Sequence, residues 1–132
     1  MRPPFPDAYA EHAPPPALRP FVACLWTRGA APPDAGAHRV LPDGCVDVLL
    51  ATTGDAVRAV AVGTMTAAAI VPPSPGTAFV AARLRPGAAR RLLGVSASAL
   101  TDLDVPIAEL WGGAHPALAE LRDLGATLAA LQ

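Results

Sequence analysis

The chain has 132 residues, of which 52% are hydrophobic and 16% are charged, and its formal net charge is −1. So apolar a chain is not intrinsically disordered, and its near-neutral charge argues against a module that grips DNA or RNA by itself. Its two cysteines are too few for a secreted disulfide scaffold, so we expect one domain with reduced thiols.

The apolar stretches are short and are bounded by Gly, Pro, Asp or Arg. None approaches the roughly 18 residues that a membrane-spanning helix needs. The N-terminus carries no apolar segment typical of a signal peptide. These features predict a cytoplasmic protein without membrane contact.

The elements begin with a proline-rich arm over residues 1–20, which we expect to be extended because proline fixes φ and lacks an N–H. Residues 21–28 are rich in β-forming side chains and predict a strand. Residues 30–37 have a loop composition. The turn Pro42-Asp43-Gly44 predicts a hairpin between strands at 38–41 and 45–51. Further strands are predicted at 57–62, 67–71 and 77–85.

Helical signals follow the strands. A helix over 88–93 is predicted to end at Gly94, Ser96 can cap a single turn reaching residue 100, and Pro106 suits the first position of a helix over 106–111, which Trp111 would anchor in the core. A last helix is predicted over 117–131. Strands followed by helices indicate an α+β fold, in which a curled antiparallel sheet carries helices at one end.

Four segments occur in the order of a known family: LRPFVACLWT (18–27), HRVLPDGCVDVLL (38–50), VGTMT (62–66) and RLRPGAARRLLGVSASALTDLDVPIAELWG (83–112). Together they resemble the amino-terminal sensor region of AraC-type bacterial transcriptional regulators, in the subgroup with an LPDGC-D hairpin. The resemblance implies a cupin-like antiparallel β-barrel or curled sheet over 21–94, and helical dimerisation segments over 95–132. It also implies DNA binding only through a carboxy-terminal helix-turn-helix domain that this chain lacks. Arg83-Leu84-Arg85 departs mildly from the family, which often has an aromatic residue in the middle.

The ligand-binding candidates are Asp47, Arg83, Cys45 and Trp26. Strand alternation puts Asp47 on the face opposite Val46 and Val48, and a carboxylate there has to be paired or solvent-facing. Arg83 or Arg85 on the strand at 77–85 could pair with it across the sheet. One interpretation is a structural ion pair; the other is a polar anchor at the mouth of a cupin-like cavity.

Four arginines cluster near the end of that strand and the start of the next helix: Arg83, Arg85, Arg90 and Arg91. They indicate either a solvated helix face, which we favour, or a docking surface for the missing DNA-binding domain or an anionic effector.

Catalytic and metal-binding patterns are absent from the sequence. The spacing of the cysteines and histidines does not match zinc-site motifs, and there is no nucleophile elbow or phosphate-binding loop. We therefore predict no metal, no cofactor and no enzymatic activity.

The predicted last helix carries Leu121, Leu124, Leu128 and Leu131 at alternating spacings of three and four residues. This stripe either packs on the protein's own sheet or forms the seam of a homodimer, and the resemblance favours the dimer. The sequence therefore predicts an effector-sensing and dimerisation domain of an AraC-type regulator, with a small molecule as ligand. The alternative is a stand-alone cupin-like small-molecule-binding protein.

Overall fold

The computed structural model describes residues 9–29, 36, 38–71, 76–111 and 123. Its strands are β1 (Ala10–His12), β2 (Val22–Arg28), β3 (His38–Val40), β4 (Asp47–Thr53), β5 (Ala56–Val62), β6 (Ala69–Val71), β7 (Thr77–Leu84) and β8 (Asp104–Pro106). The helical elements are the 3-10 turns η1 (Pro16–Leu18) and η2 (Ala97–Leu100) and the helices α1 (Ala89–Leu93) and α2 (Ile107–Trp111).

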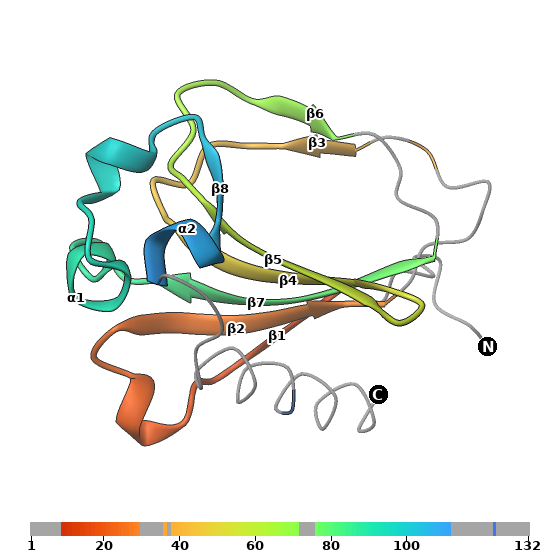
Figure 1. Cartoon of the computed structure of the whole chain (residues 1–132), viewed down its shortest axis with the longest axis horizontal. Helices are drawn as coiled ribbons and strands as arrows, with labels where there is room; N and C mark the ends of the chain where they lie inside the picture. Colours follow the sequence, from red (N-terminus) through yellow and green to blue (C-terminus); the bar gives the residue numbers. More distant parts are fainter. Residues whose placement is uncertain (1–8, 30–35, 37, 72–75, 112–122, 124–132) are drawn as a thin grey trace.

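The main sheet has six strands in the order β1-β2-β7-β4-β5-β8, and all of its pairs are antiparallel. The strands β3 and β6 form a separate antiparallel pair, which stands apart from the main sheet (Figure 1). A mostly antiparallel sheet followed by short helices agrees with the predicted α+β class. Within the described residues β1 and β8 remain edge strands, so the sheet does not close into the barrel that was one of the expected forms.

The predicted hairpin across Pro42-Asp43-Gly44 is wrong. The strand before this turn pairs with β6, and β4 after it pairs with β5 and β7. The turn itself forms, because Asp43 Oδ1 accepts a hydrogen bond from Cys45 N at 2.9 Å. Local turn chemistry was therefore read correctly, but the apolar β4 gains more by lying between two strands inside the main sheet than by pairing with its neighbour in sequence.

Of the other local predictions, some are confirmed and some are not. The helix at 88–93 is observed as α1, and Gly94 ends it with a left-handed φ of 78°. The helix predicted over 106–111 is observed as α2, which begins one residue later because Pro106 ends β8. The single turn expected to reach residue 100 is observed as η2, with Ser96 at its N-cap position, although the Ser96 hydroxyl makes no capping bond. Within the arm expected to be extended, Ala10–His12 form the strand β1, which pairs with β2, whereas Pro16–Leu18 form the 3-10 turn η1. None of the described helices is long and apolar enough to cross a membrane.

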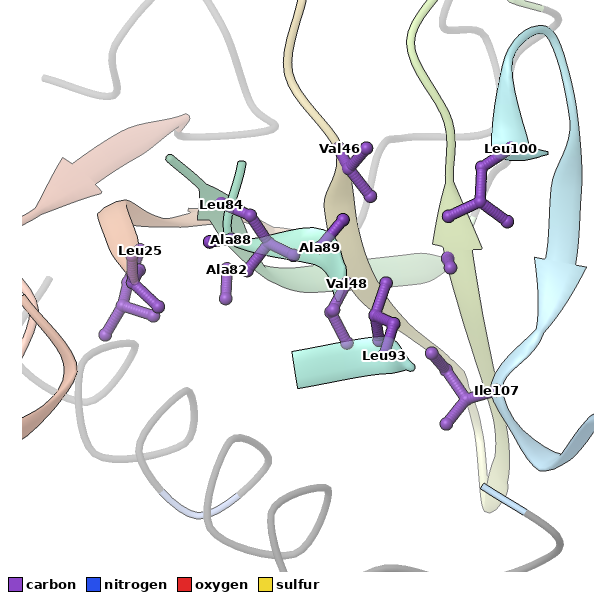
Figure 2. Packing of buried hydrophobic residues seen from close by; sticks show 12 residues of the cluster. Leu25, Val46, Val48, Ala82, Leu84, Ala88, Ala89, Leu93, Leu100 and Ile107 are labelled. Carbon is purple, nitrogen blue, oxygen red and sulfur yellow. The ribbon is translucent and has the colours of Figure 1, made fainter. Parts of the chain in front are cut away.

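The hydrophobic core lies on one face of the main sheet, where helices cover it (Figure 2). The largest fully buried side chains are Leu25 from β2, Leu84 from β7, Leu93 from α1 and Ile107 from α2. Each such side chain contributes about 1.5–3 kcal/mol by burial. Trp111 packs against this cluster and donates a hydrogen bond from Nε1 to the carbonyl of Leu92 at 3.0 Å, in keeping with its expected role as an anchor.

Candidate functional site

A row of polar side chains crosses the main sheet on the face opposite the core. Cys24 of β2, Arg83 of β7 and Asp47 of β4 are register partners on adjacent strands, so their side chains share one face. Trp26 lies two residues from Cys24 and therefore faces the same way. In register with Trp26 is Glu11 of β1.

Three carboxylates surround the guanidinium of Arg83. Arg83 Nε lies 3.4 Å from Asp43 Oδ2 and 3.6 Å from Asp47 Oδ1, and Arg83 Nη1 lies 3.6 Å from Glu11 Oε2. The Asp47 side chain is only 17% exposed, whereas those of Glu11 and Asp43 are about half exposed. Solvent screens the two exposed pairs, so the Asp47–Arg83 pair has the strongest interaction of the three.

Two aromatic side chains complete this group, which we call the Arg83 cluster: Arg83, Glu11, Asp43, Asp47, Tyr9 and Trp26. The Trp26 indole donates a hydrogen bond from Nε1 to Asp47 Oδ2 at 3.2 Å, and the Tyr9 hydroxyl donates to Glu11 Oε2 at 2.6 Å. The rings of Tyr9 and Trp26 lie 5.7 Å apart, centroid to centroid, at an angle of 37°. Each aromatic ring therefore orients one of the carboxylates around the guanidinium.

The polar contacts of the buried pair are incomplete within the described part of the chain. Arg83 Nε and Asp47 Oδ1 are both buried, yet neither makes a hydrogen bond. Their separation of 3.6 Å is an ion-pair distance, longer than an N–H···O bond. The opposite charges of Arg83 and Asp47 thus partly balance each other, while Arg83 Nε can still donate a hydrogen bond and Asp47 Oδ1 can still accept one.

Burial is the largest single influence on the pKa values of Asp47, Arg83 and the two thiols. It raises the pKa of Asp47, and this effect exceeds the lowering by the Arg83 charge and by the Trp26 hydrogen bond. At Arg83 burial lowers the pKa, but the Asp47 charge and the other polar neighbours leave it raised overall, so the guanidinium stays charged. Burial also raises the pKa of the Cys24 and Cys45 thiols, which favours the protonated, weakly nucleophilic form.

Three of the four residues predicted to bind ligand therefore lie together: Asp47, Arg83 and Trp26. Cys45 lies at the edge of the cluster, where its Sγ approaches the Asp43 carbonyl oxygen at 3.6 Å. Whether these residues bind a ligand stays a prediction.

Sequence reasoning missed three members of the cluster: Tyr9, Glu11 and Asp43. Asp43 was assigned only to a turn, and the other two were assigned to an arm outside the sheet. The one available signal was the polar-apolar alternation around Glu11, which the surrounding prolines obscured.

Two of the neighbouring arginines, Arg85 and Arg91, have partners of their own. Arg85 donates from Nε to the Arg19 carbonyl at 2.6 Å, and the Arg91 guanidinium lies over the Phe21 ring at 5.3 Å. Both contacts attach the segment before β2 to the end of β7 and to α1. Arg85 and Arg91 thus have structural partners, and both the solvated helix face and the docking surface stay predictions.

No group of three or more His, Cys, Asp or Glu side chains in the described ranges is placed to bind a metal ion. The ring of His12 lies 3.1 Å from the Thr27 hydroxyl, away from the Arg83 cluster. The proposed dimer residues Leu121, Leu124, Leu128 and Leu131 fall outside the described residues. The dimer interface therefore stays a prediction.

Comparison with known proteins gives one match. A family model for a domain of unknown function (DUF6597) matches residues 10–106, which is more than half of the chain. No curated protein and no solved structure matches it.

Proposed function

The chain belongs to the DUF6597 family of domains of unknown function, and we propose that it is the effector-sensing and dimerisation domain of a cytoplasmic AraC-type transcriptional regulator. In this proposal the antiparallel sheet is cupin-like, and a small polar molecule binds at the Arg83 cluster. The ligand then controls a DNA-binding domain attached after Gln132.

One observation carries the proposal. Two of the segments that resemble AraC-type sensors lie far apart in sequence and meet at the Arg83 cluster. The segment at 38–50 contributes Asp43 and Asp47, and the segment that starts at residue 83 contributes Arg83. An ion pair that served stability alone would need only one carboxylate, whereas this guanidinium has three and, among the described residues, keeps a buried donor without a hydrogen bond. A ligand with both a donor and an acceptor would complete these contacts.

The cluster is also connected to the helices. Only five residues separate Arg83 from the start of α1 at Ala89. Leu84, next to Arg83, is fully buried in the core that α1 and α2 cover. A ligand that pulls on Arg83 can therefore shift the balance between two helix arrangements, provided that it binds one of them more tightly.

A thermal-shift screen tests the ligand site. Wild type and Asp47→Asn are heated with a panel of amino acids, organic acids, amines and sugars, with Asp55→Asn in the exposed β4–β5 turn as the matched control. A ligand at one hundred times its Kd stabilises the folded state by about 2.7 kcal/mol. We expect at least one compound to raise the Tm of wild type and of Asp55→Asn but not of Asp47→Asn. Equal shifts in all three proteins, or no shift in any, would refute the site.

Light scattering over a concentration series tests dimerisation. We expect wild type to be a dimer, and Leu121→Asp/Leu128→Asp to be a monomer that keeps the wild-type circular dichroism spectrum. A monomeric wild type that still binds ligand would refute the dimerisation role and would fit a stand-alone binding protein. A double variant that unfolds would show that the leucine stripe belongs to the core.

A further inference from the structure

A cavity of about 270 Å³ lies at the other end of the strands that carry the Arg83 cluster. It is formed next to the β4–β5 turn, at the right of Figure 1. Its described lining comes from three adjacent strands: Ala51, Thr53, Ala56, Val57, Arg58, Thr77 and Phe79. None of these residues belongs to the Arg83 cluster.

The strand register shows how the lining is arranged. Phe79 of β7, Ala51 of β4 and Arg58 of β5 are partners across adjacent strands, so they share one face. Asp47 and Ala51 are four residues apart on β4, so the same face carries both sites, about 13 Å from each other. The half-buried Phe79 ring and the buried Ala51 provide an apolar surface, and the exposed Arg58 stands beside it.

The polar side chains of the cavity offer more hydrogen-bond donors than acceptors. Thr53 and Thr77 are register partners, and their hydroxyl oxygens lie 2.7 Å apart. Two hydroxyls carry two protons, and their mutual bond uses only one, so one O–H is left to donate to another acceptor. Arg58 adds a guanidinium, which can only donate. No Asp or Glu is among the described lining residues, although Asp55 lies in the adjacent turn.

We propose that this cavity binds a small organic anion: a carboxylate attached to a flat apolar body. The carboxylate pairs with the Arg58 guanidinium and accepts a hydrogen bond from the remaining threonine O–H, and the apolar body packs on Phe79 and Ala51. Arginine suits this ligand because its planar fork matches both oxygens of a carboxylate. The cavity is open to solvent on one side, and its volume is just below the usual range for ligand sites, roughly 300–1,000 Å³, so a ligand of about the size of a single ring fits it.

This proposal does not depend on the regulator function or on the Arg83 cluster. The two sites share no residue, and their charges have opposite signs: the cluster has three carboxylates around one guanidinium, whereas the described lining of the cavity has one guanidinium and no carboxylate. A carboxylate ligand is therefore repelled at the first site and attracted at the second.

Titration of the ¹⁵N-labelled protein with sodium benzoate, followed by NMR, tests the proposal. We expect saturable shifts of the amides of Ala51, Thr53 and Phe79, and little change around Arg83. Two further probes separate the contributions of charge and ring. Benzamide has the ring without the charge, and acetate has the charge without the ring. Each should bind at least tenfold more weakly than benzoate.

Two matched variants complete the test. Arg58→Gln should weaken benzoate binding at least tenfold, since it removes the cation while keeping most of the stem. Arg90→Gln removes the same charge from an exposed position on α1 and should leave the affinity unchanged. Equal weakening by both variants would mean that net charge alone attracts benzoate. That result, equal binding of benzoate and benzamide, or shifts centred on Arg83 would each overturn the proposal.

Discussion

Replacing Gly63 by alanine should destabilise the protein strongly. Gly63 follows β5, where the chain passes against the segment around η2. A Cβ built at Gly63 would lie 1.7 Å from the carbonyl oxygen of Leu100 and 2.5 Å from its carbonyl carbon. Real Cβ atoms essentially never come closer than 3.0 Å to another heavy atom, so one backbone segment has to move.

Hydrogen bonds resist that movement. Gly63 N donates to Leu103 O at 2.9 Å, and Asp102 N donates to Thr64 O at 2.7 Å. The Asp102 carboxylate accepts bonds from Thr66 N at 2.8 Å and from Thr66 Oγ1 at 2.7 Å. Shifting either segment by more than an ångström breaks several of these bonds at once.

The magnitude follows from these contacts. Overpacking that side chains can absorb costs about 1–3 kcal/mol. Because backbone has to move here, we expect a cost near or above the upper end of that range. Alanine restricts the unfolded chain more than glycine does, which lowers the entropy lost on folding and offsets about 0.4–1 kcal/mol of this cost. A net loss of about 2–3 kcal/mol should lower the Tm by roughly 10 °C for a domain of this size.

Urea unfolding and thermal melts of Gly63→Ala and Gly36→Ala measure the effect. Gly36 is the matched control, because no atom of the described residues lies within 4 Å of a Cβ built there and its φ is not in the left-handed region. We expect the Gly36 variant to stay within about 0.5 kcal/mol of wild type. A Gly63 variant as stable as the Gly36 variant would refute the close approach of Leu100.

Three more predictions concern single side chains. Burial raises the pKa of Asp47, so the contribution of its carboxyl group to stability is lost as pH rises through that pKa. In urea unfolding between about pH 3 and pH 7, the free energy of unfolding of Asp47→Asn should therefore rise relative to that of wild type as pH increases. A difference that does not depend on pH would contradict this. Asp102 has a left-handed φ of 58° and bonds to Thr66, so Asp102→Ala should lower the Tm more than Asp102→Asn, whose side chain tolerates that φ; equal losses would count against the strained conformation. Trp111→Phe removes the bond to the Leu92 carbonyl and should cost about 1–2 kcal/mol in urea unfolding; a neutral substitution would mean that the bond contributes nothing.

Local patterns predicted most of the strands. The alternation of residues 45–50 placed Val46, Val48 and Leu50 on one face of the strand, and in the structure all three are buried, less than 7% exposed. The same alternation placed Asp47 opposite them and suggested Arg83 or Arg85 as its partner, and the register partner is Arg83. These inferences succeed because they depend only on the two-residue period of a strand.

The short edge strands β1 and β8 escaped prediction. Each has three residues. β1 lies within proline-rich sequence, and β8 lies among residues whose sequence predicts helices. Too few residues are present in either strand to show an alternating pattern, and each forms because a longer strand offers it hydrogen bonds. Glu11 reaches the Arg83 cluster because β1 joins the sheet, so the sequence, which did not predict β1, did not predict this part of the site either.

The sequence by itself determined the class of the fold, the strands long enough to alternate, and the pairing of Asp47 with an arginine of the strand at 77–85. Only the tertiary structure decided that β4 lies between β5 and β7 instead of pairing across its own turn. It also decided that three carboxylates meet at Arg83 and that Arg58, Phe79 and a threonine pair line an open cavity. The reason is physical: periodicity is a property of one segment, whereas the choice of strand partners depends on how well all segments bury their apolar faces together.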